Sequence, residues 1–73
     1  MPKSRHLRDF IAIAHSRSLR AAATSLGLTQ PAISRSLQEL EEELGVPLFE
    51  RHARGVVLTP AGEKFLVRAQ IAS

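Results

Sequence analysis

Polar residues that can pair with bases occur at positions 30, 34, 35 and 38, at spacings that a helix would bring close together. The amide of Gln30 can pair with adenine, and the guanidinium of Arg35 can pair with O6 and N7 of guanine. Ser34 adds a hydroxyl, and Gln38 adds an amide suited to the DNA backbone. These groups predict contacts in the major groove of DNA. The alternative is that Arg35 and Gln38 are ordinary solvated helix residues.

The helix that carries these groups gives the strongest periodic signal in the chain. Thr29 is a suitable N-cap, Pro31 fits the first turn, where a missing N–H costs little, and Gly45 ends the helix. At about 100° per residue, the apolar stripe leaves Arg35 almost opposite, with Pro31 and Gln38 flanking it outward. Pro31 therefore joins the predicted base-facing set. The stripe consists of Ile33, Leu37, Leu40 and Leu44.

A shorter helix precedes this one, with Ser18 as its N-cap and Gly27 at its end. Its small residues allow close packing, and the short turn forces a large crossing angle, so residues 18–44 are predicted to form a helix-turn-helix. The predicted phosphate contacts are the backbone amides near Ser18 and Thr29 and the cation of Arg20. The buried side of the helix should be Leu19, Ala22, Ala23 and Leu26.

The first helix is predicted over residues 5–16, with Ser4 as its N-cap. Its apolar stripe would be Leu7, Phe10, Ile11 and Ala14, and its solvent side would carry Arg5, Arg8 and Asp9.

A short hairpin is predicted after residue 47, because β-type runs at residues 48–49 and 56–58 flank a segment containing Gly55, which should lie in the loop. Arg51, His52 and Arg54 surround this tip. Arg51 suits the phosphate backbone, and Arg54 suits a narrow minor groove, where the potential is most negative. A solvated turn is the alternative.

Thr59 and Pro60 form an N-cap and N1 pair that opens a fourth helix. Val67 and Ile71 lie on the side away from the main apolar stripe, so the helix has two apolar sides and needs a second partner. The alternative is an exposed apolar pair on a frayed end. No C-terminal signal precedes Ser73, so the helix is expected to continue. The main stripe is Phe65, Leu66, Ala69 and Ala72.

Charge is sorted along the chain in a way that the net value of +3 conceals: +5 over residues 1–38, −5 over residues 39–50 and +3 over residues 51–73. Such segregation favours a polyanion partner, although a solvated surface is the alternative. Glu39, Glu41, Glu42 and Glu43 would be repelled by phosphates, so only the first two turns of the third helix can enter the groove.

Other classes of protein find little support. The 73 residues can close one core without any cysteine, and His6, His15 and His52 match no metal motif. No acid pair occupies a predicted cleft, so an enzyme is not expected. The apolar run from Phe10 to Ala14 is too short for a signal peptide or a membrane span, which predicts a cytoplasmic protein.

The sequence resembles the amino-terminal domain of LysR-type bacterial transcriptional regulators over about residues 7–66. The resemblance implies a mainly helical winged helix-turn-helix over residues 1–58 and the start of a linker and dimerisation helix over residues 59–73. It also implies that Gln30, Pro31, Ser34 and Arg35 face bases and that Arg54 is the wing residue. Arg17 departs from the glycine usual in the family, and this predicts either a contact of the added cation with phosphate or a looser turn. The matching positions are Ser18, Ala22, Ala23, Thr29 to Ser34, Leu40, Glu41, Leu44, Gly45, Leu48, Phe49, Arg51, Leu58, Thr59, Ala61 and Gly62.

The resemblance further implies a homodimer on an interrupted palindrome, with Val67 and Ile71 at its interface, or a tetramer of the full-length protein. RNA polymerase is a further candidate partner. No cofactor is expected in this domain, and a small-molecule effector is expected on a C-terminal domain outside this sequence. A winged-helix module that binds other proteins is the rival reading. Its docking surface would be the acidic face over residues 39–43.

Overall fold

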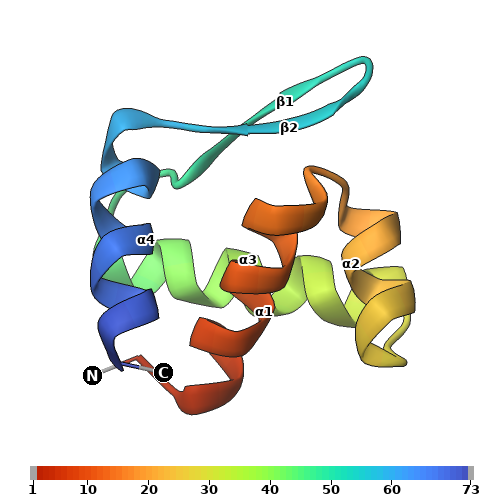
Figure 1. Cartoon of the computed structure of the whole chain (residues 1–73), viewed down its shortest axis with the longest axis horizontal. Coiled ribbons are helices and arrows are strands. Elements are labelled where there is room, and N and C mark those ends of the chain that lie inside the picture. The colour runs from red at the N-terminus through yellow and green to blue at the C-terminus, as the bar shows by residue number, and fades with distance from the viewer. Residues whose placement is uncertain (1, 73) are drawn as a thin grey trace.

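The computed structural model describes residues 2–72, in which four helices and a two-stranded hairpin share one core (Figure 1). The mainly helical, winged helix-turn-helix prediction is confirmed. Ser73, where the last helix was expected to continue, lies outside the described residues. The elements are α1 (Ser4–Ser16), α2 (Leu19–Leu26), α3 (Gln30–Leu44), β1 (Phe49–His52), β2 (Gly55–Leu58) and α4 (Pro60–Ala72).

Hydroxyl caps fix the starts of three helices. Ser18 Oγ accepts a hydrogen bond from the Ala21 N–H at 3.0 Å, and Thr29 Oγ1 accepts one from the Ala32 N–H at 3.2 Å. Thr59 Oγ1 accepts from the Gly62 N–H at 2.9 Å. Three of the four predicted N-caps, Ser18, Thr29 and Thr59, are therefore confirmed.

The predicted cap of α1 is wrong. Ser4 is the first helical residue, and the N-cap position falls on Lys3, which makes no side-chain capping bond. The N–H groups of His6 and Leu7 both donate to the Lys3 carbonyl, at 3.0 and 3.2 Å, and this places the start of the helix one residue earlier. The N-cap of α1 is therefore formed by the Lys3 carbonyl and not by a side chain.

The core is centred on the fully buried ring of Phe10 in α1. Its centroid lies 5.3 Å from that of Phe49 in β1 and 5.1 Å from that of Phe65 in α4, the latter edge-on. Aromatic pairs at such separations add stability beyond the area that they bury. The three phenylalanines of the chain therefore connect α1, the hairpin and α4.

The buried face of α1 differs from the predicted stripe. Ile13 is fully buried, whereas Leu7, Ile11 and Ala14 are only half-buried. The prediction that Asp9 faces solvent is wrong, because its side chain is buried and its carboxylate pairs with the Arg8 guanidinium at 2.8 Å. The cause is the packing of α2 and α3 on both flanks of α1, which covers a wider face than the apolar positions mark.

The outer ends of other stripes are also less buried than predicted. Leu26 and Leu44 are half-buried, as are Phe65 and Leu66, and Ala72 is exposed. Helix ends project beyond the elements packed against them, so their apolar residues keep part of their surface in water. The centres of the stripes, at Ile33, Leu37, Leu40 and Ala69, are buried as predicted.

The hairpin pairs antiparallel from Phe49 opposite Leu58 to His52 opposite Gly55. Ala53 and Arg54 form its turn, so Gly55 begins β2 instead of lying in the loop as predicted. Gly55 has φ of +137°, and a Cβ there would lie 2.3 Å from the carbonyl oxygen of Arg17. Both the dihedral and the close approach require glycine.

Arg17 links the hairpin to α1 and is a non-glycine residue in the left-handed conformation, with φ of 57°. Its N–H donates to the Ile13 carbonyl at 2.8 Å, and its own carbonyl accepts from the Val56 N–H at 3.1 Å. The turn is thus closed and carries a direct bond to β2. Whether the Arg17 side chain also contacts DNA phosphate stays a prediction.

Replacing Arg17 with glycine should therefore stabilise the domain. The left-handed conformation costs a non-glycine residue about 1–2 kcal/mol, and the extra unfolded-state freedom of glycine offsets about half of this. We expect the free energy of unfolding to rise by about 0.5–1 kcal/mol, measured by urea denaturation. Arg17→Ala is the control, since it removes the charge and keeps the strain. An equal gain from Arg17→Ala would contradict the conformational explanation.

Candidate nucleic-acid interface

The amino-terminal half of α3 presents its polar side chains away from the core. Gln30, Pro31, Arg35 and Gln38 are exposed and Ser34 is half-exposed. On the opposite side of the same helix, the stripe centred on Ile33 and Leu37 is buried, as the helical wheel predicts. An amide, a hydroxyl and a guanidinium therefore share one open face at the start of α3.

A groove of about 230 Å³ lies between the hairpin and the amino ends of α2 and α3. Four of the predicted DNA-contacting residues line it: Ser18, Arg20, Gln30 and Arg51. The structure thus brings together residues up to 33 positions apart in sequence. His52 also lines this groove, 3.6 Å from the Glu50 carboxylate. From the sequence, His52 was expected near the tip of the hairpin, without a predicted DNA contact.

Arg54 and Thr29 lie outside that groove. Arg54 is exposed in the turn of the hairpin, and Thr29 is exposed at the N-cap of α3. In Figure 1 the hairpin extends past the end of α1 toward the side of the molecule that carries α2. Arg54 therefore stands at the far end of an arm that begins beside the core.

The carboxylates on the second half of α3 have specific structural partners. Glu41 Oε2 accepts hydrogen bonds from the Leu48 N–H at 2.6 Å and the Phe49 N–H at 3.3 Å. From the sequence, Glu41 was predicted only to be a charge that phosphates repel. Its wheel position next to the buried stripe was the signal that it faces the chain after α3. Through these two hydrogen bonds Glu41 of α3 fixes the start of β1.

Glu39 joins α3 to α1. Its Oε1 lies 2.9 Å from His6 Nε2 and 3.5 Å from Arg5 Nη2. The hydrogen bond with His6 is the main cause that lowers the pKa of the Glu39 carboxyl; burial opposes this shift and the charge of Arg5 adds to it. Contact with a carboxylate requires a proton on Nε2 of the buried His6 ring. Its position on the covered face of α1 could not be read from apolar spacing.

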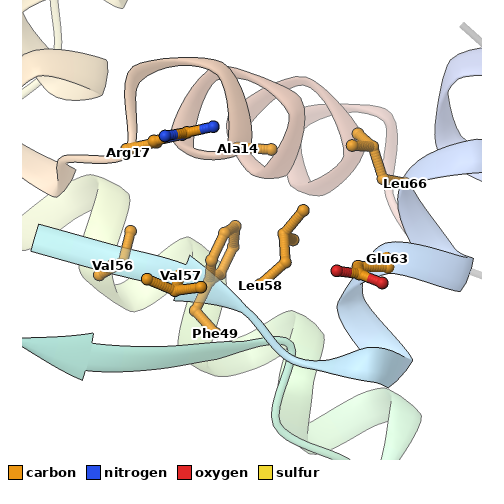
Figure 2. Close-up of a pocket in the computed structure, with 8 residues that line it drawn as sticks. All are labelled: Ala14, Arg17, Phe49, Val56, Val57, Leu58, Glu63 and Leu66. Atoms are coloured by element: carbon orange, nitrogen blue, oxygen red, sulfur yellow. The ribbon is translucent and has the colours of Figure 1, made fainter.

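A second hollow, of about 380 Å³, lies under the hairpin (Figure 2). Phe49 and the residues of β2 form one wall, and Figure 2 shows Arg17, at the C-cap of α1, and Glu63 on α4 at opposite ends. Small-molecule sites combine apolar walls with polar groups that converge on one point. Here the two charged groups lie at opposite ends and do not converge. The hollow is therefore a gap between the packed surfaces of the hairpin, α1 and α4, and it lacks the arrangement of a small-molecule site.

Val67 and Ile71 are 58% and 80% exposed on α4, on the side away from the buried Ala69. The structure therefore leaves uncovered the apolar pair for which the sequence analysis predicted a second partner.

Within residues 2–72, no group of three or more potential metal-ligating side chains could hold an ion. Over the same range no helix is long and apolar enough to cross a membrane.

A family model described as "Bacterial regulatory helix-turn-helix protein, lysR family" matches residues 4–63. The chain belongs to this family. The similarity is spread over α1, the helix-turn-helix and the hairpin, so the LysR-family domain was correctly identified from its sequence.

Relatives of this LysR-family domain are regulators several times its length. It is 51% identical over 65 residues to the HTH-type transcriptional regulator BudR of Raoultella terrigena, covering 89% of this chain and 22% of that protein. It is 53% identical over 66 residues to the HTH-type transcriptional regulator ClcR of Pseudomonas putida, covering 90% of this chain and 22% of that protein. The chain thus spans about a fifth of these relatives.

Solved structures share the fold of this LysR-family domain. A CbnR_DBD-DNA complex matches with a TM-score of 0.93 and 46% identity, covering 96% of this chain and 80% of that one. A BenM_DBD/catB site 1 DNA complex matches with a TM-score of 0.92 and 44% identity, covering 96% and 79%. OxyR of Corynebacterium glutamicum in its oxidized form matches with a TM-score of 0.94 and 44% identity, covering 99% of this chain and 22% of that one.

Proposed function

We propose that this domain binds double-stranded DNA sequence-specifically, as the DNA-binding part of a bacterial transcriptional regulator. The observation that carries the proposal is the open polar face on the first half of α3, opposite the buried residues Ile33, Leu37 and Leu40. The similar CbnR and BenM domains are described as complexes with DNA, which supports the proposal. The first turns of α3 enter the major groove, and its acidic second half stays outside.

Gln30, Pro31, Ser34 and Arg35 contact base edges. Arg35 is the strongest candidate for specificity, because a guanidinium that pairs with O6 and N7 of guanine discriminates by about 1–3 kcal/mol. Ser34 adds a hydroxyl beside it, and Pro31 offers an apolar surface to a thymine methyl group. Gln30 lies where this face meets the groove between the hairpin and the amino ends of α2 and α3.

Residues at the starts of α2 and α3 and on the hairpin contact the DNA backbone. The hydroxyls of Ser18 and Thr29 accept bonds from their own helices and still have a proton to donate to a phosphate oxygen. Arg20 and Arg51 face one groove and supply positive charge. The backbone set is Ser18, Arg20, Thr29, Gln38 and Arg51.

Arg54 enters the minor groove beside the site read by α3. Its exposure in the turn of the hairpin leaves the guanidinium free to reach beyond the body of the domain. Narrow minor grooves concentrate negative potential, which favours an inserted arginine.

Two copies of the chain bind as a homodimer on an interrupted palindrome, with Val67 and Ile71 at the interface. Their exposure on α4 supports this, because a large apolar side chain gains about 1.5–3 kcal/mol when fully buried. Residues 1–58 form the DNA-binding domain and residues 59–73 begin the linker helix. A C-terminal effector-binding domain completes the regulator, which assembles as a dimer or tetramer in the cytoplasm.

The domain itself needs no cofactor and catalyses no reaction; the small-molecule effector acts on the C-terminal domain. RNA polymerase is the partner that a bound regulator would contact. The rival, a protein-docking module using the acidic face of α3, is weakened by Glu41, whose carboxylate is taken up by two backbone N–H groups.

Salt titration of the affinity for a DNA duplex tests the proposed function. The logarithm of the binding constant should fall with the logarithm of salt concentration, with a slope of about −0.9 per phosphate contacted. Arg20→Ala should make the slope shallower by about 0.9. Arg68→Ala is the matched control, since Arg68 lies on α4 away from the proposed interface. No binding, or a flat salt response, would favour the protein-docking module.

A further inference from the structure

We propose that Arg5 and Arg8 of α1 bind a phosphate of the DNA backbone, beside Arg35 and on the edge of α3 away from the hairpin. The inference rests on the proposed function, since it adds a backbone contact to the same complex. Neither residue belongs to the set assigned above. Both were predicted to lie on the solvent side of the first helix, and both are exposed.

The three arginines line one groove of about 200 Å³ between α1 and α3. Arg5 and Arg8 come from the first two turns of α1, and Arg35 comes from the face of α3 that points to the bases. Because Arg35 belongs to both surfaces, a strand bordering the base pairs that it reads must pass close to this groove. The residues that line it with the arginines are Asp9, Leu28, Ala32, Ser36 and Glu39.

The two arginines of α1 are held in place by carboxylates. Arg8 Nε donates to Asp9 Oδ1 at 2.9 Å, and the buried Asp9 fixes the direction of that guanidinium. Arg5 Nη2 lies 3.5 Å from Glu39 Oε1. Each guanidinium has more N–H donors than one carboxylate oxygen can accept, and about half of each arginine side chain remains exposed. Donors therefore remain for a phosphate.

Two further features favour an anion. Ser36 Oγ is buried at the wall of the groove and has no hydrogen-bond partner within residues 2–72. Lys3, at the N-cap of α1, makes no side-chain capping bond, and no acidic residue of the helix's own first turn offsets the positive end of the helix. Three arginines against two carboxylates leave the groove with net positive charge.

The competing explanation is that these ion pairs only hold α1 to α3. If the ion pairs only hold α1 to α3, Glu39→Gln should leave DNA binding unchanged or weaken it. If Arg5 binds phosphate, Glu39→Gln should strengthen DNA binding. Glutamine keeps an oxygen that can accept the hydrogen bond from His6, while the charge that competes with phosphate for Arg5 is lost. We expect DNA to bind about three-fold more tightly, in line with the strength of an exposed ion pair. Glu42→Gln is the matched control, with the same change in net charge on a residue that does not line this groove.

The experiment measures binding of a labelled duplex by the wild-type chain and the variants over a range of salt. Arg5→Gln and Arg8→Gln should each weaken binding to specific and random duplexes equally, and the slope should become shallower by up to about 0.9. Thermal unfolding of each variant verifies that it is folded at the assay temperature. The inference is overturned if both slopes stay at the wild-type value, or if Glu39→Gln binds no more tightly than Glu42→Gln. Failure of the wild-type chain to bind any duplex would instead refute the proposed function.

Discussion

Gly62→Ala should lower the free energy of unfolding by about 3 kcal/mol, at the upper end of the range for overpacking a close contact. A Cβ at position 62 would lie 2.1 Å from the carbonyl oxygen of Leu48 and 2.9 Å from Leu58 Cδ2. The carbonyl cannot easily retreat, because it also accepts a hydrogen bond from the Thr59 N–H at 3.0 Å. For a chain of this size such a loss is a large fraction of the total stability.

The sign of this effect separates packing from helix propensity. Gly62 lies inside α4, where alanine would ordinarily stabilise the helix by about 0.5–1 kcal/mol. Gly45→Ala is a useful comparison, because position 45 has open space around it and a positive φ of +75°. It should cost about 1 kcal/mol through its backbone alone. Urea denaturation measures both variants, and a stabilised Gly62→Ala protein would show that α4 does not pack against the Leu48 carbonyl as described.

Arg35→Ala should weaken binding to the specific DNA site by about 1–3 kcal/mol, or roughly 5- to 150-fold, and relax the preference for the base that Arg35 contacts. The reason is that a guanidinium reads two acceptors of guanine together, and no other exposed side chain in the first two turns of α3 can replace that pair of bonds. Competition binding with duplexes that vary at one position at a time measures the change.

Arg20→Ala supplies the control for this prediction. Arg20 lies on α2, in the groove between the hairpin and the amino ends of α2 and α3, where it is assigned to phosphate. Its loss should therefore weaken specific and random duplexes by similar factors. The assigned role of Arg35 would be contradicted if Arg35→Ala also lowered both affinities equally.

The sequence predicted the elements well where local chemistry decides them. Ser18, Thr29 and Thr59 begin helices because their hydroxyls satisfy free N–H groups, and this needs only neighbouring residues. The stripe around Ile33 and Leu37 likewise follows from periodicity alone. The faces of α3 therefore follow from the chain without knowledge of the packing.

The errors arose where tertiary packing decides the environment. Asp9 and His6 are buried because α3 covers a wider part of α1 than its apolar residues mark, and their partners Arg8 and Glu39 make the burial tolerable. The structural role of Glu41 depends on the return of the chain at Leu48. Local spacing can mark the side that a residue faces, as it does for Glu41, but it does not identify a partner that is distant in sequence.

The residues predicted to contact DNA come from separate segments that only the fold brings together. The base-facing residues follow from one helix, whereas the groove shared by Arg20 and Arg51 requires the hairpin to fold back toward α2. The position of the hairpin is fixed at Gly55, because its lack of a side chain allows the carbonyl of Arg17 to approach β2 and accept a hydrogen bond from Val56. The geometry of the wing thus depends on the end of α1 as much as on its own strands.

The ratio of affinities for a selected site and for a scrambled duplex of equal length tests the central claim most directly. The site would be obtained by selecting bound sequences from a random DNA pool, and both affinities would be measured with the same chain at the same salt concentration. Sequence-specific binding through the first turns of α3 predicts a ratio on the order of 10³ or more. A ratio near one, with both duplexes bound, would contradict it.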